Sequence, residues 1–432
     1  MLPRMHHEAL LRDWKTLCSD IGERRAGTAG ERRAAEFIAS EWNAAGLTAV
    51  NVEPFPCLTM AELRAEVHEP AAQGWQEVEA VPLVGTRPTR GTAPIEAELA
   101  WLDLPESTHR LRPRSLRGKI LMLFGSIPTD ATAYRRLVAA EPVAVIHVDE
   151  RLPFPWAKND GMYPYWIRRY GVSPTLTVPY TVAWRWRLAG VSRLKVRVIT
   201  QAESGESQNV AGEIAGRDPR LPAILVTAHH DTQCNNTGAD DNASGVVCLL
   251  SLARRLVKLS RPLRTVRFVS FGTEEQLSVG SDVYVRRHAN SRRNTALVVN
   301  IDSVASPLGH FLLWVSGSPA LEHYATRRLA TRGVDVLVKR EVCPFFDSFP
   351  FNRAGVPSLT LMRQNFSGGR WQHHSIHDSL ENISPAETQR LLEGVGPLIR
   401  AVAQSRVLPF AAGLPAVQLR TAQKLSRDLL GV

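Results

Sequence analysis

The sequence contains few cysteines, and the five that it has (Cys18, Cys57, Cys234, Cys248 and Cys343) are scattered and odd in number. No two of them stand in the CxxC spacing that is typical of thiolate zinc sites and redox motifs. Neither a disulfide framework nor a cysteine-bound metal is therefore indicated, and we expect reduced thiols.

Long hydrophobic runs are also missing. No stretch reaches the roughly 18 uninterrupted apolar residues that a membrane-spanning helix needs. The first residues, Met1 to His7, lack the apolar core of a signal peptide. The simplest expectation is a cytoplasmic protein with no membrane partner.

Positive charge is in excess, with a net charge of +10 over 432 residues, but no single basic block carries it. The excess comes from dispersed pairs such as Arg24-Arg25 and Arg254-Arg255, a pattern typical of solvated helix faces. Binding to phosphates requires positive charges gathered on one surface. We therefore predict no nucleic-acid partner.

The composition changes along the chain in a way that predicts a catalytic domain interrupted by an insert. Residues 205–432 alternate between short apolar runs and amphipathic helical stretches, which favours an α/β fold with a mostly parallel central sheet flanked by helices. Residues 81–204 contain short strands and frequent proline. We predict one discontinuous domain, 1–80 with 205–432, and a smaller mixed β domain, 81–204. Nothing in either pattern decides the oligomeric state.

Acidic and imidazole side chains recur just beyond the predicted strands. In open α/β sheets, ligands bind at the carboxyl ends of the strands. Several such groups at one edge are hard to explain as helix caps or turn residues. In chain order they are His229, Asp231, Glu274, Glu275, Asp302 and His374.

The adjacent carboxylates Glu274 and Glu275 give the sharpest signal. At the mouth of a buried strand, repulsion and desolvation raise the pKa of at least one of them unless a cation neutralises the pair. A divalent metal bound to one would leave the other free as a base. The alternative is that both lie in the first turn of a helix and interact with its dipole, which does not explain the histidines.

These residues belong to a longer set of motifs that runs in order over nearly the whole chain. The set comprises Ala26-Gly-Thr-Ala-Gly30, Asn209-Val210, His229-His-Asp231, the run from Gly238 to Gly245, Glu274-Glu275, Asn300-Ile-Asp302, the run from Asp347 to Phe351 with Gly355-Val-Pro357, and the run from His374 to Leu380. It resembles the M28 family of metal-dependent exopeptidases, whose best-known members are aminopeptidases with two zinc ions. The resemblance implies a three-layer zinc-exopeptidase-like fold.

The resemblance also implies the metal ligands. One ion would be bound by His229 and Asp302, and the other by Glu275 and His374, with Asp240 bridging the two. Such a set of imidazoles and carboxylates without thiolates suits Zn²⁺, and also Co²⁺ or Mn²⁺. We expect two ions per chain, and zinc by its abundance.

The remaining implied roles concern catalysis and support. Glu274 would be the general base that activates a water molecule shared by the two ions, and Asp231 would orient His229. A cis peptide is expected at Asp240-Asp241. Among three nearby histidines His374 is chosen, because it alone stands four residues before Asp378.

The leading prediction is an aminopeptidase that removes N-terminal residues from peptides. A carboxypeptidase of the same fold is an alternative, because Arg353, Arg363 and Arg370 could bind a C-terminal carboxylate. Another alternative is a single-zinc glutaminyl cyclase. The presence of His229 together with Asp302 indicates a second metal and so argues against the cyclase. From a different class, a non-catalytic binding protein is expected to lack some ligands, and here all are present.

The insert has a weaker resemblance of its own. The runs 116–123 and 143–148 are similar to parts of the protease-associated domain that many M28 members carry. The resemblance assigns no catalytic residue to the insert.

Overall fold

The computed structural model describes residues 2–102, 112–125, 130–149, 151, 153–288, 290, 294–365 and 370–432, with side chains from residue 8 onward. The chain forms two compact units, one of Met1–Cys57 with Gly205–Ser426 and the other of Leu58–Ser204 with Arg427–Val432. The sequence placed the first division near residue 80. The structure divides the chain earlier, within the long strand β1 (Thr48–Ala71), which runs without a break from the first unit into the second.

The first unit is built on a mostly parallel sheet. Strands β10, β9, β11 and β14 lie side by side in this order and run parallel, whereas β12 is antiparallel to β14 and β8 is antiparallel to β10. Strand β13 pairs with β12 at the far edge. The strands are β8 (Arg193–Ile214), β9 (Ala223–His229), β10 (Val266–Phe271), β11 (Thr295–Ile301), β12 (His310–Ser316), β13 (Val336–Lys339) and β14 (Ser358–Gln364).

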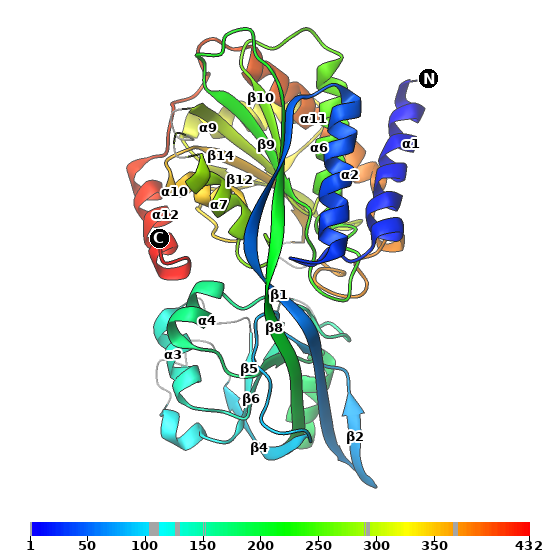
Figure 1. The fold of residues 1–432 in the computed structure, drawn as a ribbon, viewed down its shortest axis with the longest axis vertical. Coiled ribbons are helices and arrows are strands. Elements are labelled where there is room, and N and C mark those ends of the chain that lie inside the picture. The colour runs from blue at the N-terminus through cyan, green and yellow to red at the C-terminus, as the bar shows by residue number, and fades with distance from the viewer. Residues whose placement is uncertain are drawn as a thin grey trace. The chain divides into compact units, whose positions relative to one another are not determined.

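Helices cover both faces of this sheet, so the predicted three-layer α/β fold is confirmed (Figure 1). The central strands are buried along their whole length, as expected of near-continuous apolar runs. One face packs against α1 (Leu2–Lys15), the π-helical turn η1 (Thr16–Ile21), α2 (Ala29–Ala45), α6 (Ala243–Val257), α9 (Pro319–Ala330) and α11 (Pro385–Gln404). The other face packs against α7 (Val279–Arg287) and α10 (Ser348–Arg353).

The first unit also contains the short 3₁₀ turn η4 (Leu380–Asn382), which precedes α11, and most of α12 (Ala416–Leu429), whose residues from Arg427 onward belong to the second unit. Within the described residues, no helix combines the length and the apolar character needed to cross a membrane.

The start of α6 is fixed to the edge of the sheet by its N-cap residue. The Asn242 side chain accepts a hydrogen bond from Gly245 N at 2.8 Å and donates one to Ile301 O at 3.0 Å. A capping side chain satisfies a helix N–H that would otherwise lack a partner. Because Ile301 ends β11, this contact holds the loop before α6 beside the carboxyl ends of the parallel strands.

In the second unit the strands β4, β5, β6 and β7 lie side by side in this order and run parallel, with β3 antiparallel to β7 and the first part of β8 antiparallel to β4. Its core includes buried residues of β5 and β6 with Trp186 of α5. Its elements are β2 (Gly74–Val78), β3 (Val81–Pro82), β4 (Ile95–Leu102), the 3₁₀ turn η3 (Pro113–Leu116), β5 (Ile120–Phe124), α3 (Ala131–Ala139), β6 (Ala144–Val148), α4 (Pro164–Tyr170), β7 (Thr175–Thr177) and α5 (Tyr180–Ala189).

The packing of α1 generates a stability prediction. Trp14 is fully buried, and its indole N–H donates a hydrogen bond to Ala239 O at 2.9 Å. Trp14→Ala is expected to lower the free energy of unfolding by roughly 3–5 kcal/mol, because it leaves a cavity and an unpaired carbonyl. Leu11→Ala, at an exposed position of the same helix, should cost less than about 1 kcal/mol. Urea denaturation followed by circular dichroism measures both, and equal costs would contradict the prediction.

Candidate metal centre and active site

The predicted site residues lie at one edge of the sheet because neighbouring parallel strands end there. His229 is the last residue of β9, and it is level with Phe271, the last residue of β10. Glu274 follows β10 by three residues, and Asp302 directly follows β11. This is the edge at which open α/β sheets bind ligands.

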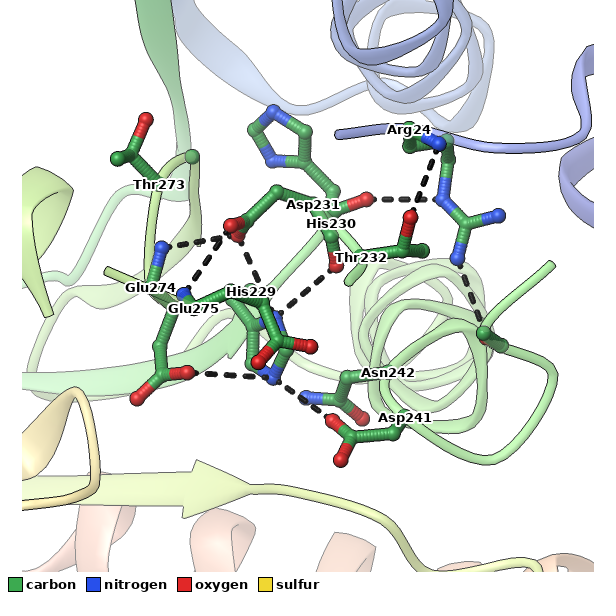
Figure 2. Close-up of polar contacts among 12 residues, drawn as sticks. Arg24, His229, His230, Asp231, Thr232, Asp241, Asn242, Thr273, Glu274 and Glu275 are labelled. Atoms are coloured by element: carbon green, nitrogen blue, oxygen red, sulfur yellow. Dashed lines mark hydrogen bonds and ion pairs between the residues drawn. The ribbon is translucent and has the colours of Figure 1, made fainter. Parts of the chain in front are cut away.

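The His229 imidazole is at the centre of the cluster (Figure 2). Its Nε2 atom lies 3.2 Å from Asp241 Oδ1, 3.8 Å from Asp302 Oδ1 and 3.9 Å from Glu274 Oε2. The ring is 1% exposed. His229 and Asp302 are thus brought together as predicted for one metal position.

Asp241 lies between two groups of possible ligands. While its Oδ1 faces His229, its Oδ2 lies 3.4 Å from His373 Nε2 and 3.6 Å from His374 Nε2. Among the described residues, the ligand atoms of two trios lie within 4.8 Å of one another: His229, Asp241 and Asp302, and Asp241, His373 and His374. Asp241 is therefore the residue that the two trios share.

Asp240, the residue predicted to bridge the metals, lies outside both trios. The Asp240 carboxylate accepts hydrogen bonds from Ala305 N at 2.7 Å and Gln372 Nε2 at 3.0 Å. The cis peptide was predicted one residue too early, since it joins Asp241 and Asn242. Two adjacent aspartates in a loop look alike in sequence, and the backbone decides which of them faces the histidines.

The second metal position contains more than the sequence predicted. Glu275 Oε2 lies 3.2 Å from His374 Nε2, so the two predicted ligands meet. His373, set aside on the spacing to Asp378, is also directed at Asp241. The pair His373-His374 was a visible signal in the sequence, but the spacing argument retained only one of them.

Asp231 supports the centre from behind. Its Oδ1 atom lies 3.4 Å from His229 Nδ1, and its carboxylate accepts hydrogen bonds from the backbone N–H groups of Glu274 at 2.9 Å and Glu275 at 3.1 Å (Figure 2). One carboxylate thus contacts the histidine of β9 and holds the loop after β10. Such outer contacts fix the orientation of ligand side chains.

Two further buried groups hold the loop that carries Asp241. Asp378 accepts hydrogen bonds from Asp240 N at 2.6 Å and Asp241 N at 2.9 Å. Arg24 donates to the carbonyls of His230, Thr237 and Gly238 at 2.8, 2.7 and 3.1 Å. Its fully buried guanidinium also donates to Leu17 O and Gly22 O. The sequence marked Asp378 only by its spacing to His374, and no sequence signal marked Arg24.

Burial dominates the electrostatics of the cluster. It raises the pKa of Glu274 well above its usual value although His229 opposes the shift, and it also raises the pKa of Glu275. The pKa of Asp378 rises to about 8 by burial and by the charge of Asp240. Burial works against the charged form of His229 too, but hydrogen bonds to Asp231 and Asp241 raise its pKa well above 6.5.

The donor set fits divalent metal ions. Its members are imidazole nitrogens and carboxylate oxygens, all buried except those of the half-buried His374, and these are ligands that Zn²⁺ takes in catalytic sites and that Co²⁺ and Mn²⁺ also accept. So many carboxylates buried together are costly unless a cation neutralises them. The residues present therefore fit the metal that the sequence predicted.

Of the three arginines considered for a substrate carboxylate, Arg370 is the one that reaches the cluster. Its Nη2 atom lies 3.1 Å from Asp241 Oδ2. Arg353 instead pairs with Asp282 at 2.7 Å, and Arg363 donates to Ser306 O at 2.7 Å.

Comparison with known proteins is consistent with this site. Residues 209–399 match the profile of Peptidase family M28. Aminopeptidase YwaD of Bacillus subtilis is 28% identical over 224 residues, covering 50% of this chain and 47% of that protein. Carboxypeptidase Q of Bos taurus is 27% identical over 314 residues, covering 68% and 64%. The chain thus spans less than two thirds of the length of each relative.

The fold is also similar to that of solved structures. A zinc aminopeptidase from Bacillus subtilis aligns with a TM-score of 0.72 at 21% identity, over 94% of this chain and 98% of that chain. At this identity the likeness shows the fold. The match to the family profile begins after the insert, whose resemblance to a protease-associated domain stays a prediction.

Asp347, which precedes α10, has a buried carboxyl group whose charged form is strongly disfavoured by burial. It is 1% exposed, and among the described residues neither of its carboxylate oxygens has a partner that meets hydrogen-bond geometry, although a contact with Ser281 lowers its pKa slightly. Burial raises the pKa of Asp347 to about 7, with His229 opposing the shift and Asp231 adding to it. Because an unfolded aspartate has a pKa of about 3.9, the folded state keeps a proton that the unfolded state loses. This contribution to stability is full below about pH 4 and is lost as the pH rises toward 7.

Asp347→Asn should therefore change how the stability of the metal-free protein depends on pH. We expect its free energy of unfolding to match the wild type near pH 4 and to exceed it by roughly 1–3 kcal/mol near pH 7.5, because the amide does not ionise. Denaturant titrations with a chelator at several pH values measure the difference. Asp335→Asn, at an exposed position, is the control. A difference that does not vary with pH would show that Asp347 is not the titrating group.

Proposed function

We propose that the protein is a metal-dependent exopeptidase of the M28 type that hydrolyses N-terminal residues from peptides, and the match of residues 209–399 to the profile of Peptidase family M28 supports this. The observation that carries the proposal is the bridging geometry of Asp241, whose two carboxylate oxygens face His229 on one side and His373 and His374 on the other. One carboxylate shared by two ligand groups suits a pair of ions.

We assign two zinc ions to the site. His229, Asp302 and Asp241 would hold one, and Asp241, His374 and Glu275 the other, with Asp241 taking the bridging role first predicted for Asp240. When bound, such a pair polarises the scissile carbonyl and lowers the pKa of water at the site.

Glu274 is proposed as the general base. Its Oε2 atom lies beside the cluster, 3.9 Å from His229 Nε2, while its Oε1 accepts a hydrogen bond from Ser278 Oγ at 3.2 Å. One oxygen is thus anchored and the other faces the site. Because burial raises its pKa, Glu274 can accept a proton from the attacking water and deliver it to the leaving amine. Asp231 keeps His229 and the Glu274 backbone in place throughout.

Glu274→Gln tests this role, since it keeps the size of the side chain and removes the base. We expect kcat to fall by roughly 10²–10⁴-fold while the metal content stays at the wild-type level. Mass-spectrometric metal analysis and peptide hydrolysis are measured on the same preparation. Glu393→Gln, on an exposed face of α11, is the matched control. Unchanged turnover in Glu274→Gln would remove Glu274 from the mechanism.

A carboxypeptidase activity is the second candidate, and Arg370 is the observation that favours it. Its buried guanidinium beside Asp241 could bind the carboxylate of a peptide C-terminus. An aminopeptidase requires a free N-terminus on its substrate, whereas a carboxypeptidase requires a free C-terminus.

The deciding experiment is hydrolysis of one peptide series with free ends, a blocked N-terminus or a blocked C-terminus, with and without a chelator. Loss of cleavage on blocking the N-terminus, together with sensitivity to the chelator, is the expected result. Loss on blocking the C-terminus instead would replace the aminopeptidase by the carboxypeptidase. Cleavage that survives complete removal of metal would contradict both.

A further inference from the structure

We propose that His373 is itself a metal ligand, so that the second metal position binds its ion through two adjacent imidazoles, His373 and His374, together with Asp241. The inference rests on the proposed function, because it concerns one of its two metal positions. The family resemblance assigned a single histidine to this position.

The two rings are placed to bind one ion. Their centroids are 3.7 Å apart and their planes differ by 23°, so the rings are stacked. The Nε2 atoms of His373 and His374 lie 3.4 and 3.6 Å from the same atom, Asp241 Oδ2. All three ligand atoms lie within 4.8 Å of one another. Ligands about 2.0–2.2 Å from one tetrahedral zinc ion lie roughly 3.3–3.6 Å from one another, and the two distances to Asp241 Oδ2 agree with this.

The local backbone explains how neighbouring residues present their rings to one point. Side chains of consecutive residues in an extended strand point in opposite directions. His374 instead has a φ of 54°, in the left-handed region that residues other than glycine seldom adopt. The segment turns at this point, with His373 N donating to Arg370 O at 3.3 Å and Ser375 Oγ donating to Gln372 O at 2.7 Å.

The second metal position is largely buried, and a neutral ligand such as the His373 imidazole adds no further charge to it. The side chains of His373 and His374 are 10% and 15% exposed, and that of Asp241 is 7% exposed. Arg370 adds a positive charge 3.1 Å from Asp241 Oδ2. Glu275, 3.2 Å from His374, supplies the second carboxylate. A neutral imidazole completes a four-ligand set of two nitrogens and two oxygens that suits tetrahedral zinc.

The two metal positions would then differ in chemistry. The first trio offers one imidazole with two carboxylates, Asp241 and Asp302, whereas the second offers two imidazoles. Nitrogen ligands favour Zn²⁺ and Co²⁺ over Mn²⁺, which prefers oxygen. The second position should therefore discriminate against Mn²⁺ more strongly than the first.

The test is titration of the metal-free, full-length protein with Co²⁺, followed by visible absorption and calorimetry. The variants are His373→Ala, His374→Ala and the matched control His377→Ala, whose ring packs against Trp371 at 5.1 Å. We expect the wild type and His377→Ala to bind two ions alike. In His373→Ala the second Kd should rise at least about tenfold, with a changed spectrum, while the first Kd stays within about twofold.

A second variant gives a new absorption band, which a misfolded protein would not produce. In His373→Cys a thiolate replaces the imidazole, and Co²⁺ should produce a sulfur-to-cobalt charge-transfer band in the near ultraviolet that the wild type lacks. An unchanged second Kd and spectrum in His373→Ala, or no such band in His373→Cys, would overturn the inference while leaving the proposed peptidase intact. A wild-type protein that bound no Co²⁺ would overturn both proposals.

Discussion

The structure depends on one electrostatic constraint, which is that like charges are buried together at a single edge of a sheet. Glu274, Asp241 and Asp302 lie within 4 Å of the same imidazole nitrogen of His229. Their mutual repulsion and desolvation oppose folding unless cations or protons compensate them. The raised pKa values of Glu274 and Glu275 are one result of this cost. A second result is a shell of buried hydrogen bonds around the cluster that holds it in place.

That shell uses backbone groups more than side chains. Asp231 and Asp378 each accept two main-chain N–H bonds from the loops that carry the ligands. A carboxylate that accepts several N–H bonds restrains the loop that donates them, so ligand positions are fixed before any ion binds. Asn242 adds a third tie, from the start of α6 to the end of β11.

The sequence was sufficient to predict the features that regular secondary structure dictates. Buried strands were visible as apolar runs, and parallel strands must bring their carboxyl ends to one edge, so the meeting of His229, Asp302 and Glu275 near that edge was predictable. The sequence could not distinguish Asp240 from Asp241, because only the backbone of the loop decides which carboxylate points inward. It also could not reveal the ring of His373 beside that of His374, since stacked neighbours require an uncommon backbone angle. Arg24 was invisible because its partners are carbonyls, which every residue has.

Arg24 has a consequence for how the chain matures on the ribosome. Its guanidinium binds carbonyl groups more than 200 positions further along the chain, with the whole insert between them in sequence. All of residues 58–204 are synthesised before these distant carbonyls. The N-terminal segment therefore cannot make these hydrogen bonds until residues 230–238 have left the ribosome. Assembly of the metal centre is thus a late event in synthesis, and a nascent chain that stops within the insert has no means of binding metal at this site.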